Sequence, residues 1–200
     1  ALMTKIKNDV SLIRVHDFPG GYRTSSMSEV LQGIIKKDQI PLEKQKESGK
    51  LKERLLREQL GDNIHEEEYI WKELLGLGTH DMTILRGVFG DPIRVIAATA
   101  IPGIPSGAPP KTTGTTIVSL LDYGRAKCTF EIGGPEHTWF DEELAAFASD
   151  QTISIRFPYP WIKNMPTIVT ITKEKNGGFE ESKITHSYQE AFKLEHVHFL

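Results

Sequence analysis

The chain has 200 residues, of which 38% are hydrophobic and 26% are charged, and its formal net charge is −3 at pH 7. This length and balance are typical of one globular unit that buries a sizeable core. The charge balance gives no basic surface of the kind that nucleic acids require, so we expect no nucleic-acid partner. The single cysteine, Cys128, excludes a disulfide framework and favours a reduced, cytoplasmic setting. Cys128 lies in an alternating, strand-like run and is predicted to be a buried core residue.

No run of apolar residues approaches the ~18 that a membrane-spanning helix needs, and the N-terminal residues lack a signal-peptide pattern. The sequence therefore predicts a soluble protein without a membrane partner. The chain starts almost directly with a strand-like run at 10–15 and stops within an amphipathic stretch at 188–200. Since natural domains seldom start and stop so abruptly, we expect a C-terminal fragment or an excised domain.

The first part of the chain predicts a strand followed by helices. After the strand at 10–15, a short helix capped by serine is expected up to about residue 37. A second helix is expected after Pro41, with leucines at helical spacing among balanced acidic and basic residues. The segment 38–64 is therefore predicted to be a charged helical excursion, which either is solvated or serves as a partner-binding arm.

Residues 76–90 predict a helix that carries the most informative histidine of the chain. Gly76 and Gly78 allow unusual backbone conformations at its start, and Thr79 can cap its first turn. His80 would then lie beside the positive end of the helix dipole, which favours the neutral imidazole that accepts a proton. Five apolar residues at helical spacing place one face of this helix in the core: Met82, Ile84, Leu85, Val88 and Phe89.

The rest of the chain is rich in β-formers, and Asn176-Gly177 is its strongest hairpin signal. Successive strands with short turns, and helices grouped before them, predict an α+β fold. In this fold a largely antiparallel sheet has helices packed on one face, and its other face is open. The predicted strands are 93–100, 115–123, 127–132, 142–148, 152–157, 167–172 and 179–185.

The helix around His80 resembles the Asp-x-Gly-x-His-x-x-Asp helix of the Gfo/Idh/MocA family of NAD(P)-dependent sugar and polyol oxidoreductases. Gly78 matches the family glycine, and His80 matches its active-site histidine. Ser149-Asp150 lies where the family has a Gly-Ser-Asp-Gly-Thr-Ile turn, and 188–199 looks like the start of the family's closing helix. The resemblance covers roughly residues 10 to 200.

This resemblance implies that residues 1–200 form one domain, the substrate-binding and oligomerisation domain of an NAD(P)-dependent oxidoreductase acting on a sugar, polyol or related hydroxy compound. NAD or NADP would be bound mainly by a Rossmann domain before residue 1, since no Gly-x-Gly-x-x-Gly turn follows a strand here. The fragment alone is therefore expected to be inactive. The resemblance also implies a small-molecule substrate and a homo-oligomer formed through the open face of the sheet.

His80 is the catalytic residue that the resemblance implies, and it would hydrogen-bond the substrate hydroxyl that becomes a carbonyl. Two departures from the family pattern lie beside it: Gly76 replaces the acidic residue four positions earlier, and Thr83 replaces the second aspartate. Thr83, one turn beyond Thr79, can supply a hydrogen bond in place of the absent carboxylate, but no charge. These departures keep two alternatives open. One is a non-catalytic sugar or dinucleotide sensor or scaffold on the same fold, and the other is a domain that only dimerises.

Further candidates for binding substrate are Thr79, Thr83, His16, Asp17 and Trp71. His16 and Asp17 directly follow the first strand, where its end opens into a glycine turn, and they either contact substrate or form a structural hydrogen bond. Trp71 is either a platform for a sugar ring or a core residue. No metal site is predicted, because a helix would point the rings of His196 and His198 apart.

Overall fold

The computed structural model describes residues 3, 6–19, 41–63, 69–71, 73–101, 105–106, 111–112, 115–134, 139–160, 162–189 and 191–199. The short helix predicted to reach residue 37 lies outside these ranges. The helix predicted after Pro41 and the strands predicted after residue 93 lie within them, so these predictions can be compared with the structure directly.

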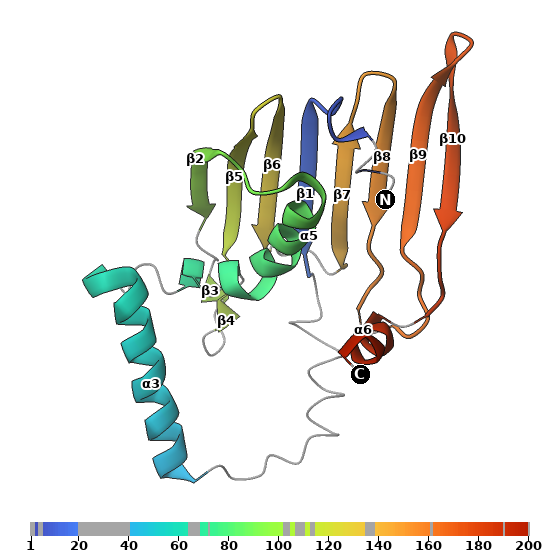
Figure 1. Cartoon of the computed structure of the whole chain (residues 1–200). Coiled ribbons are helices and arrows are strands. Elements are labelled where there is room, and N and C mark those ends of the chain that lie inside the picture. Colours follow the sequence, from blue (N-terminus) through green and yellow to red (C-terminus); the bar gives the residue numbers. More distant parts are fainter. Residues whose placement is uncertain are drawn as a thin grey trace.

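An eight-stranded sheet forms most of the described chain, in the order β10-β9-β8-β7-β1-β6-β5-β2 (Figure 1). Neighbouring strands are antiparallel except β1 and β6, which pair in parallel near the centre. The predicted α+β class with a largely antiparallel sheet is therefore confirmed. A separate two-stranded piece pairs β3 (Pro105–Ser106) with β4 (Lys111–Thr112). The strands of the main sheet are β1 Leu12–Phe18, β2 Arg94–Ile101, β5 Thr116–Tyr123, β6 Ala126–Gly133, β7 Asp141–Phe147, β8 Gln151–Arg156, β9 Ile168–Lys175 and β10 Gly178–Thr185.

The turn between β9 and β10 is the predicted Asn176-Gly177 hairpin turn, with φ values of 52° and 78°. Positive φ at both central residues matches the right-handed twist of the flanking strands. The first strand extends further than predicted, to Phe18, because it pairs with β6 on one side and β7 on the other. His16 and Asp17 therefore lie within β1 rather than beyond its end.

Helix α5 (Thr79–Phe89) packs across the middle of the sheet, over β1 (Figure 1). Alternate residues of β1 point toward it, and Ile13, Val15 and Asp17 are buried there. Leu85 of α5 belongs to the same buried cluster, as does Cys128 of β6, which was predicted to be a core residue. The core therefore lies between α5 and the centre of the sheet, and the opposite side of the sheet is called the open face below.

The other helices lie away from this central layer. The predicted helix after Pro41 is α3 (Leu42–Leu60), which extends away from the sheet, ends in a short 3-10 turn, and buries Leu56 (Figure 1). Helix α6 (Ala191–Phe199) lies near the end of the sheet where β10 finishes (Figure 1). None of the helices in the described ranges combines the length and the apolar character needed to cross a membrane.

The helix that carries His80 starts earlier than predicted. Tyr69–Trp71 are already helical, and a π-helical turn, η3 (Leu74–Gly78), leads into α5 without a break. Thr79 has helical backbone angles, and the start of α5 has no side-chain cap. The predicted cap at Thr79 is therefore wrong, and so is the position of His80 beside the positive end of a helix.

Gly78 lies inside the helical stretch because it packs closely against the sheet. Gly78 is buried and helical, and a Cβ added to it would lie 3.1 Å from Ile132 Cδ1 and 3.6 Å from Phe130 Cζ. Since both of those side chains come from β6, Gly78 allows η3 to approach the sheet closely. The glycine that resembles the family residue thus serves helix-to-sheet packing rather than a change in chain direction.

Candidate functional site

Three carboxyl groups from three elements meet beneath the N-terminal half of α5. Asp17 of β1 and Glu142 of β7 are directly opposite each other in the antiparallel register, on the face that α5 covers. Asp81, in the first turn of α5, is fully buried, and Asp17 is 3% exposed. The three groups are close enough to perturb one another electrostatically. We call Asp17, Asp81 and Glu142 the carboxyl cluster.

The carboxyl cluster holds protons at neutral pH. Burial, together with the nearby Asp17 carboxyl, raises the pKa of Asp81 to about 8. Burial also raises the pKa of Glu142 to about 8, with further contributions from Asp17 and Asp81. A buried carboxyl group costs far less free energy when it is neutral than when it is charged. Neither oxygen of Asp81 has a hydrogen-bond partner among the described residues, which agrees with a neutral group.

His80 lies one residue before Asp81, and the helix turns the two side chains in different directions. Asp81 faces the sheet, whereas His80 is exposed on the flank of α5. Gly76, one turn before His80, is also exposed, and a Cβ added there meets no heavy atom within 4 Å. The position that the resembled family fills with an acid is therefore open space on the same side of the helix as the imidazole.

Thr79 and Thr83 both donate their hydroxyl hydrogens to the helix itself. Thr79 Oγ1 lies 3.0 Å from the carbonyl oxygen of Leu75 and 3.2 Å from that of Gly76. Thr83 Oγ1 donates to the carbonyl of Thr79 at 2.6 Å. Because both side chains are exposed, their oxygens can still accept hydrogen bonds. Thr83 is thus placed to accept a hydrogen bond from a ligand.

The two predicted residues near the end of β1 are separated by the sheet. Asp17 joins the carboxyl cluster, whereas His16 points to the open face. There His16 Nε2 lies 3.3 Å from Asp141 Oδ1, and its ring stacks on Phe18 with 5.3 Å between the ring centroids. Trp71 is half-buried in the helical stretch before η3. The structure thus brings Asp17 to the α5 side of the sheet and leaves His16 on the other side.

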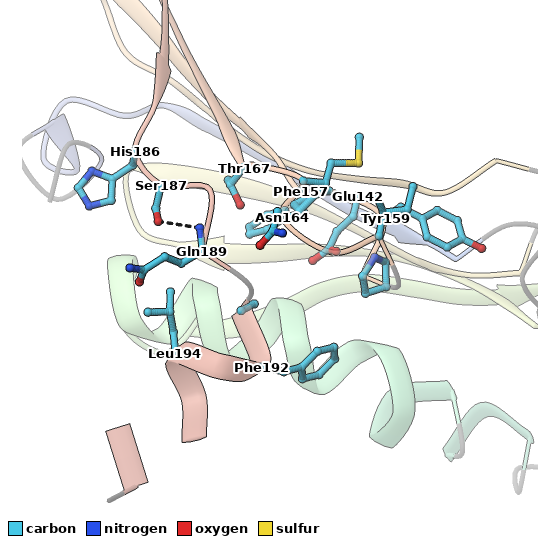
Figure 2. A pocket seen from close by; sticks show the side chains of 15 residues that line it. Glu142, Phe157, Tyr159, Asn164, Thr167, His186, Ser187, Gln189, Phe192 and Leu194 are labelled. Atoms are coloured by element: carbon cyan, nitrogen blue, oxygen red, sulfur yellow. Dashed lines mark hydrogen bonds between the residues drawn. The ribbon is translucent and has the colours of Figure 1, made fainter. Parts of the chain in front are cut away.

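A cavity of about 380 Å³ lies beside the carboxyl cluster, between the ends of the strands and α6. Glu142 lines this cavity, so it belongs both to the cluster and to the cavity wall. Figure 2 shows Asn164 and Thr167, from the connection between β8 and β9, on one side and Phe192 of α6 on the other. We call this space the α6 cavity.

The sequence analysis missed Asp81, Glu142 and the α6 cavity. For Asp17 and Glu142, the sequence did contain a signal. Asp17 lies on the same strand face as Val15, and Glu142 lies on the same strand face as Leu144. An acidic residue in an otherwise apolar, inward alternation indicates a buried polar group that needs a partner. Asp81 carries no such signal, since an acid in the first turn of a helix is ordinarily explained by the helix dipole.

The Ser149-Asp150 turn, the second motif of the resemblance, lies at the opposite end of β7 from Glu142. Ser149 donates two hydrogen bonds to Asp9 Oδ2, from its hydroxyl at 2.5 Å and from its amide at 3.2 Å. Arg125 donates to the other oxygen of Asp9 at 3.2 Å. In this chain the turn therefore ties the β7–β8 connection to the segment before β1.

No protein-family model and no curated protein matches this sequence. Among solved structures, the chain is similar to a putative NADPH-dependent oxidoreductase from Desulfitobacterium hafniense DCB-2, with a TM-score of 0.50 and 11% identity over 98% of this chain and 49% of that one. It is also similar to KijD10, a 3-ketoreductase from Actinomadura kijaniata in complex with TDP-benzene and NADP. For KijD10 the TM-score is 0.52 and the identity 9%, over 98% of this chain and 46% of that one. The chain has the fold of these oxidoreductases. The chain spans less than half the length of either structure. The fold that it shares with them is the fold that the resemblance to the Gfo/Idh/MocA family implies.

Proposed function

We propose that the chain is the substrate-binding domain of an NAD(P)-dependent oxidoreductase that acts on a sugar, a polyol or a related hydroxy compound. The observation that supports this most is the fold shared over 98% of the chain with two oxidoreductases, one of which was solved with NADP. At such low sequence identity, a shared fold identifies the architecture of the domain but does not identify its reaction. The reaction is therefore argued from the residues around His80.

The nicotinamide cofactor would be held mainly by another domain. The sequence contains no Gly-x-Gly-x-x-Gly turn after a strand, so the dinucleotide-binding fingerprint is not within these 200 residues. When bound, the cofactor would accept hydride from the carbon that carries the reacting hydroxyl. This chain would contribute the contacts that orient the substrate and move its proton.

His80 is the residue we assign to that proton. It is exposed on α5, so a ligand resting on this side of the helix can reach its imidazole. The exposed oxygens of Thr79 and Thr83 would accept hydrogen bonds from other hydroxyls of the same ligand. Asp81, the next residue, is buried against the sheet, and its raised pKa keeps it largely uncharged at neutral pH.

A second function is favoured by Gly76. No side chain occupies the space one turn before His80, so the imidazole lacks the acidic neighbour that the resembled family has there. A histidine without that partner suits a binding site better than a catalytic one. The alternative proposal is therefore a non-catalytic sugar or dinucleotide sensor or scaffold on the same fold.

We also propose that residues 1–200 act as one domain within a cytoplasmic homo-oligomer. The open face of the sheet supports this proposal, because Leu12, Phe18 and Phe147 on that face are apolar and only partly buried. Sedimentation equilibrium would test it. A concentration-independent monomer mass would reject the oligomer.

The main proposal is tested with the protein encoded by the complete reading frame. Reduction of NAD and NADP is followed with a panel of sugars and polyols for the wild type, His80→Ala and His196→Ala. We expect His80→Ala to lower turnover about 100-fold or more, as loss of a general base does. His196, an exposed histidine of α6, is the matched control and should be replaceable. Binding of cofactor or sugar without any turnover by the wild type would favour the sensor.

A further inference from the structure

The α6 cavity is separate from the residues assigned to the oxidoreductase reaction. His80, Thr79 and Thr83 do not line it, whereas Glu142 does. Its volume of about 380 Å³ falls within the range of roughly 300–1,000 Å³ typical of small-molecule sites. It is therefore a candidate binding site whose test does not depend on the proposed reaction.

Aromatic rings supply much of the cavity wall. Phe157 and Tyr159 come from the chain after β8, and Phe192 comes from α6 (Figure 2). The ring of Tyr159 is supported by Phe140, with 5.4 Å between the centroids and an edge-to-face angle of 66°. Aromatic walls of this kind bury flat apolar surface and stack on it with a preferred geometry.

A local turn lies in the link between β10 and α6. The amide of Gln189 donates to Ser187 Oγ at 3.0 Å, and this bond lies in the link between β10 and α6 (Figure 2). Both residues line the cavity, so the same turn that positions α6 also forms part of the wall. The cavity wall is therefore continuous along the chain from the end of β10 to Phe192 of α6.

The polar groups of the cavity include no lysine or arginine among the described residues. Asn164 and Gln189 supply amides, Thr167 and Ser187 supply hydroxyls, and His186 supplies an imidazole. Burial raises the pKa of Glu142 to about 8, so its carboxyl group can donate a hydrogen bond at neutral pH. A phosphate or carboxylate ligand would find no lysine or arginine among these side chains, and a polyhydroxylated ligand would leave hydroxyls facing the apolar walls.

We propose that the α6 cavity binds an uncharged, planar aromatic molecule with one amide-like edge. Its ring would lie between Phe157 and Phe192, and its carbonyl and amine edge would meet Glu142 and Asn164. Such a ligand replaces water at the apolar walls and still provides hydrogen-bond partners for Glu142 and Asn164.

The test uses benzamide as the neutral probe and compares it with benzoate and glucose, by titration of the 200-residue chain at neutral pH. Saturable binding is followed by NMR line broadening of each compound. We expect benzamide to bind more tightly than either comparison compound. Benzoate or glucose binding as tightly as benzamide, or no saturable benzamide binding, would overturn the proposal.

Two phenylalanines of α6 provide a matched pair of variants. Phe192 lines the cavity and Phe199 does not, and both are substantially exposed, so neither truncation removes core packing. We expect Phe192→Ala to raise the dissociation constant of benzamide about fivefold or more, and Phe199→Ala to leave it unchanged. Equal effects of the two substitutions would show that benzamide binds elsewhere and would overturn the assignment.

Discussion

Asp17 and Glu142 stand directly opposite each other where β1 pairs with β7, on the face of the sheet that α5 covers. Two neighbouring carboxyl groups do not readily ionise together, because their negative charges repel each other. Helix α5 adds a third carboxyl group, that of Asp81. Burial and this repulsion raise the pKa of both Asp81 and Glu142 to about 8, so these two groups are largely protonated at neutral pH beneath an exposed histidine. This arrangement makes the stability of the α5–sheet contact depend on pH.

The first prediction concerns Asp81→Asn. The pKa of Asp81 is raised from 3.8 to about 8 on folding, so the native state holds this proton more tightly than the unfolded state. The stabilisation is complete below the unfolded pKa and is lost as the pH rises toward the folded pKa. Asn has a similar shape and does not titrate. Relative to the variant, the wild type should lose up to about 1.4 kcal/mol of unfolding free energy per pH unit between about pH 5 and pH 8.

Urea unfolding across this pH range measures that difference. Asp150→Asn, at an exposed aspartate in the β7–β8 turn, is the matched control and should follow the wild type. If the wild-type and Asp81→Asn curves stay parallel over the whole range, Asp81 does not carry a raised pKa.

The second prediction compares two glycines of one helix. Gly76→Ala adds a methyl group to open space and removes a helix-disfavouring residue, so we expect a gain of up to about 1 kcal/mol in unfolding free energy. Gly78→Ala places its methyl group 3.1 Å from Ile132 Cδ1, which offsets that gain with an overpacking cost of about 1–3 kcal/mol. Thermal or urea unfolding should rank Gly76→Ala above Gly78→Ala. The reverse ranking would mean that Gly78 is not at a close contact.

The third prediction concerns Gly76→Asp, which supplies the carboxylate that the resembled family has one turn before the histidine. The site has room for the side chain, and the new group would lie on the same side of the helix as His80. If the protein is an oxidoreductase limited by that missing acid, turnover of the complete protein should rise about tenfold or more. Gly76→Asn, with the same shape and no charge, is the control. Equal turnover by the two variants would remove any role for the charge.

The fourth prediction concerns the turn at Ser149. Hydrogen bonds from the Ser149 hydroxyl and amide, followed by the charge of Arg125, lower the pKa of Asp9. Ser149→Ala removes the largest of these contributions, so the pKa of Asp9 should rise toward its ordinary value. Arg125→Ala should raise it less. An NMR titration of the Asp9 carboxyl carbon measures both shifts, and a larger effect of Arg125→Ala would contradict this order.

Much of the fold was predictable because its signals are local. The alternating strands after residue 93, the Asn176-Gly177 turn and the helix after Pro41 each follow from the residues within them. The parallel pairing of β1 with β6 was not predicted, since it joins segments more than a hundred positions apart, and no local pattern encodes such a contact.

The same distinction explains the site. His80 was predicted from its motif and stays a prediction, but the predicted helix start was wrong because Gly78 packs against Ile132, a residue far away in sequence. Asp17, Asp81 and Glu142 become a cluster only when β1, α5 and β7 are assembled. The chemistry of this cluster therefore depends on tertiary structure, whereas the proposal for His80 needs only its neighbours in the chain.

Isotope transfer tests the proposed oxidoreductase function most directly. The complete protein is incubated with NAD or NADP and a polyol that carries deuterium on its hydroxyl-bearing carbons, and the nicotinamide is analysed by mass spectrometry. The proposal predicts one deuterium on the reduced nicotinamide with the wild type. With His80→Ala, it predicts that the rate of deuterium transfer decreases by about 100-fold or more. Binding of the cofactor with no deuterium transferred from any polyol or sugar of the panel would contradict it.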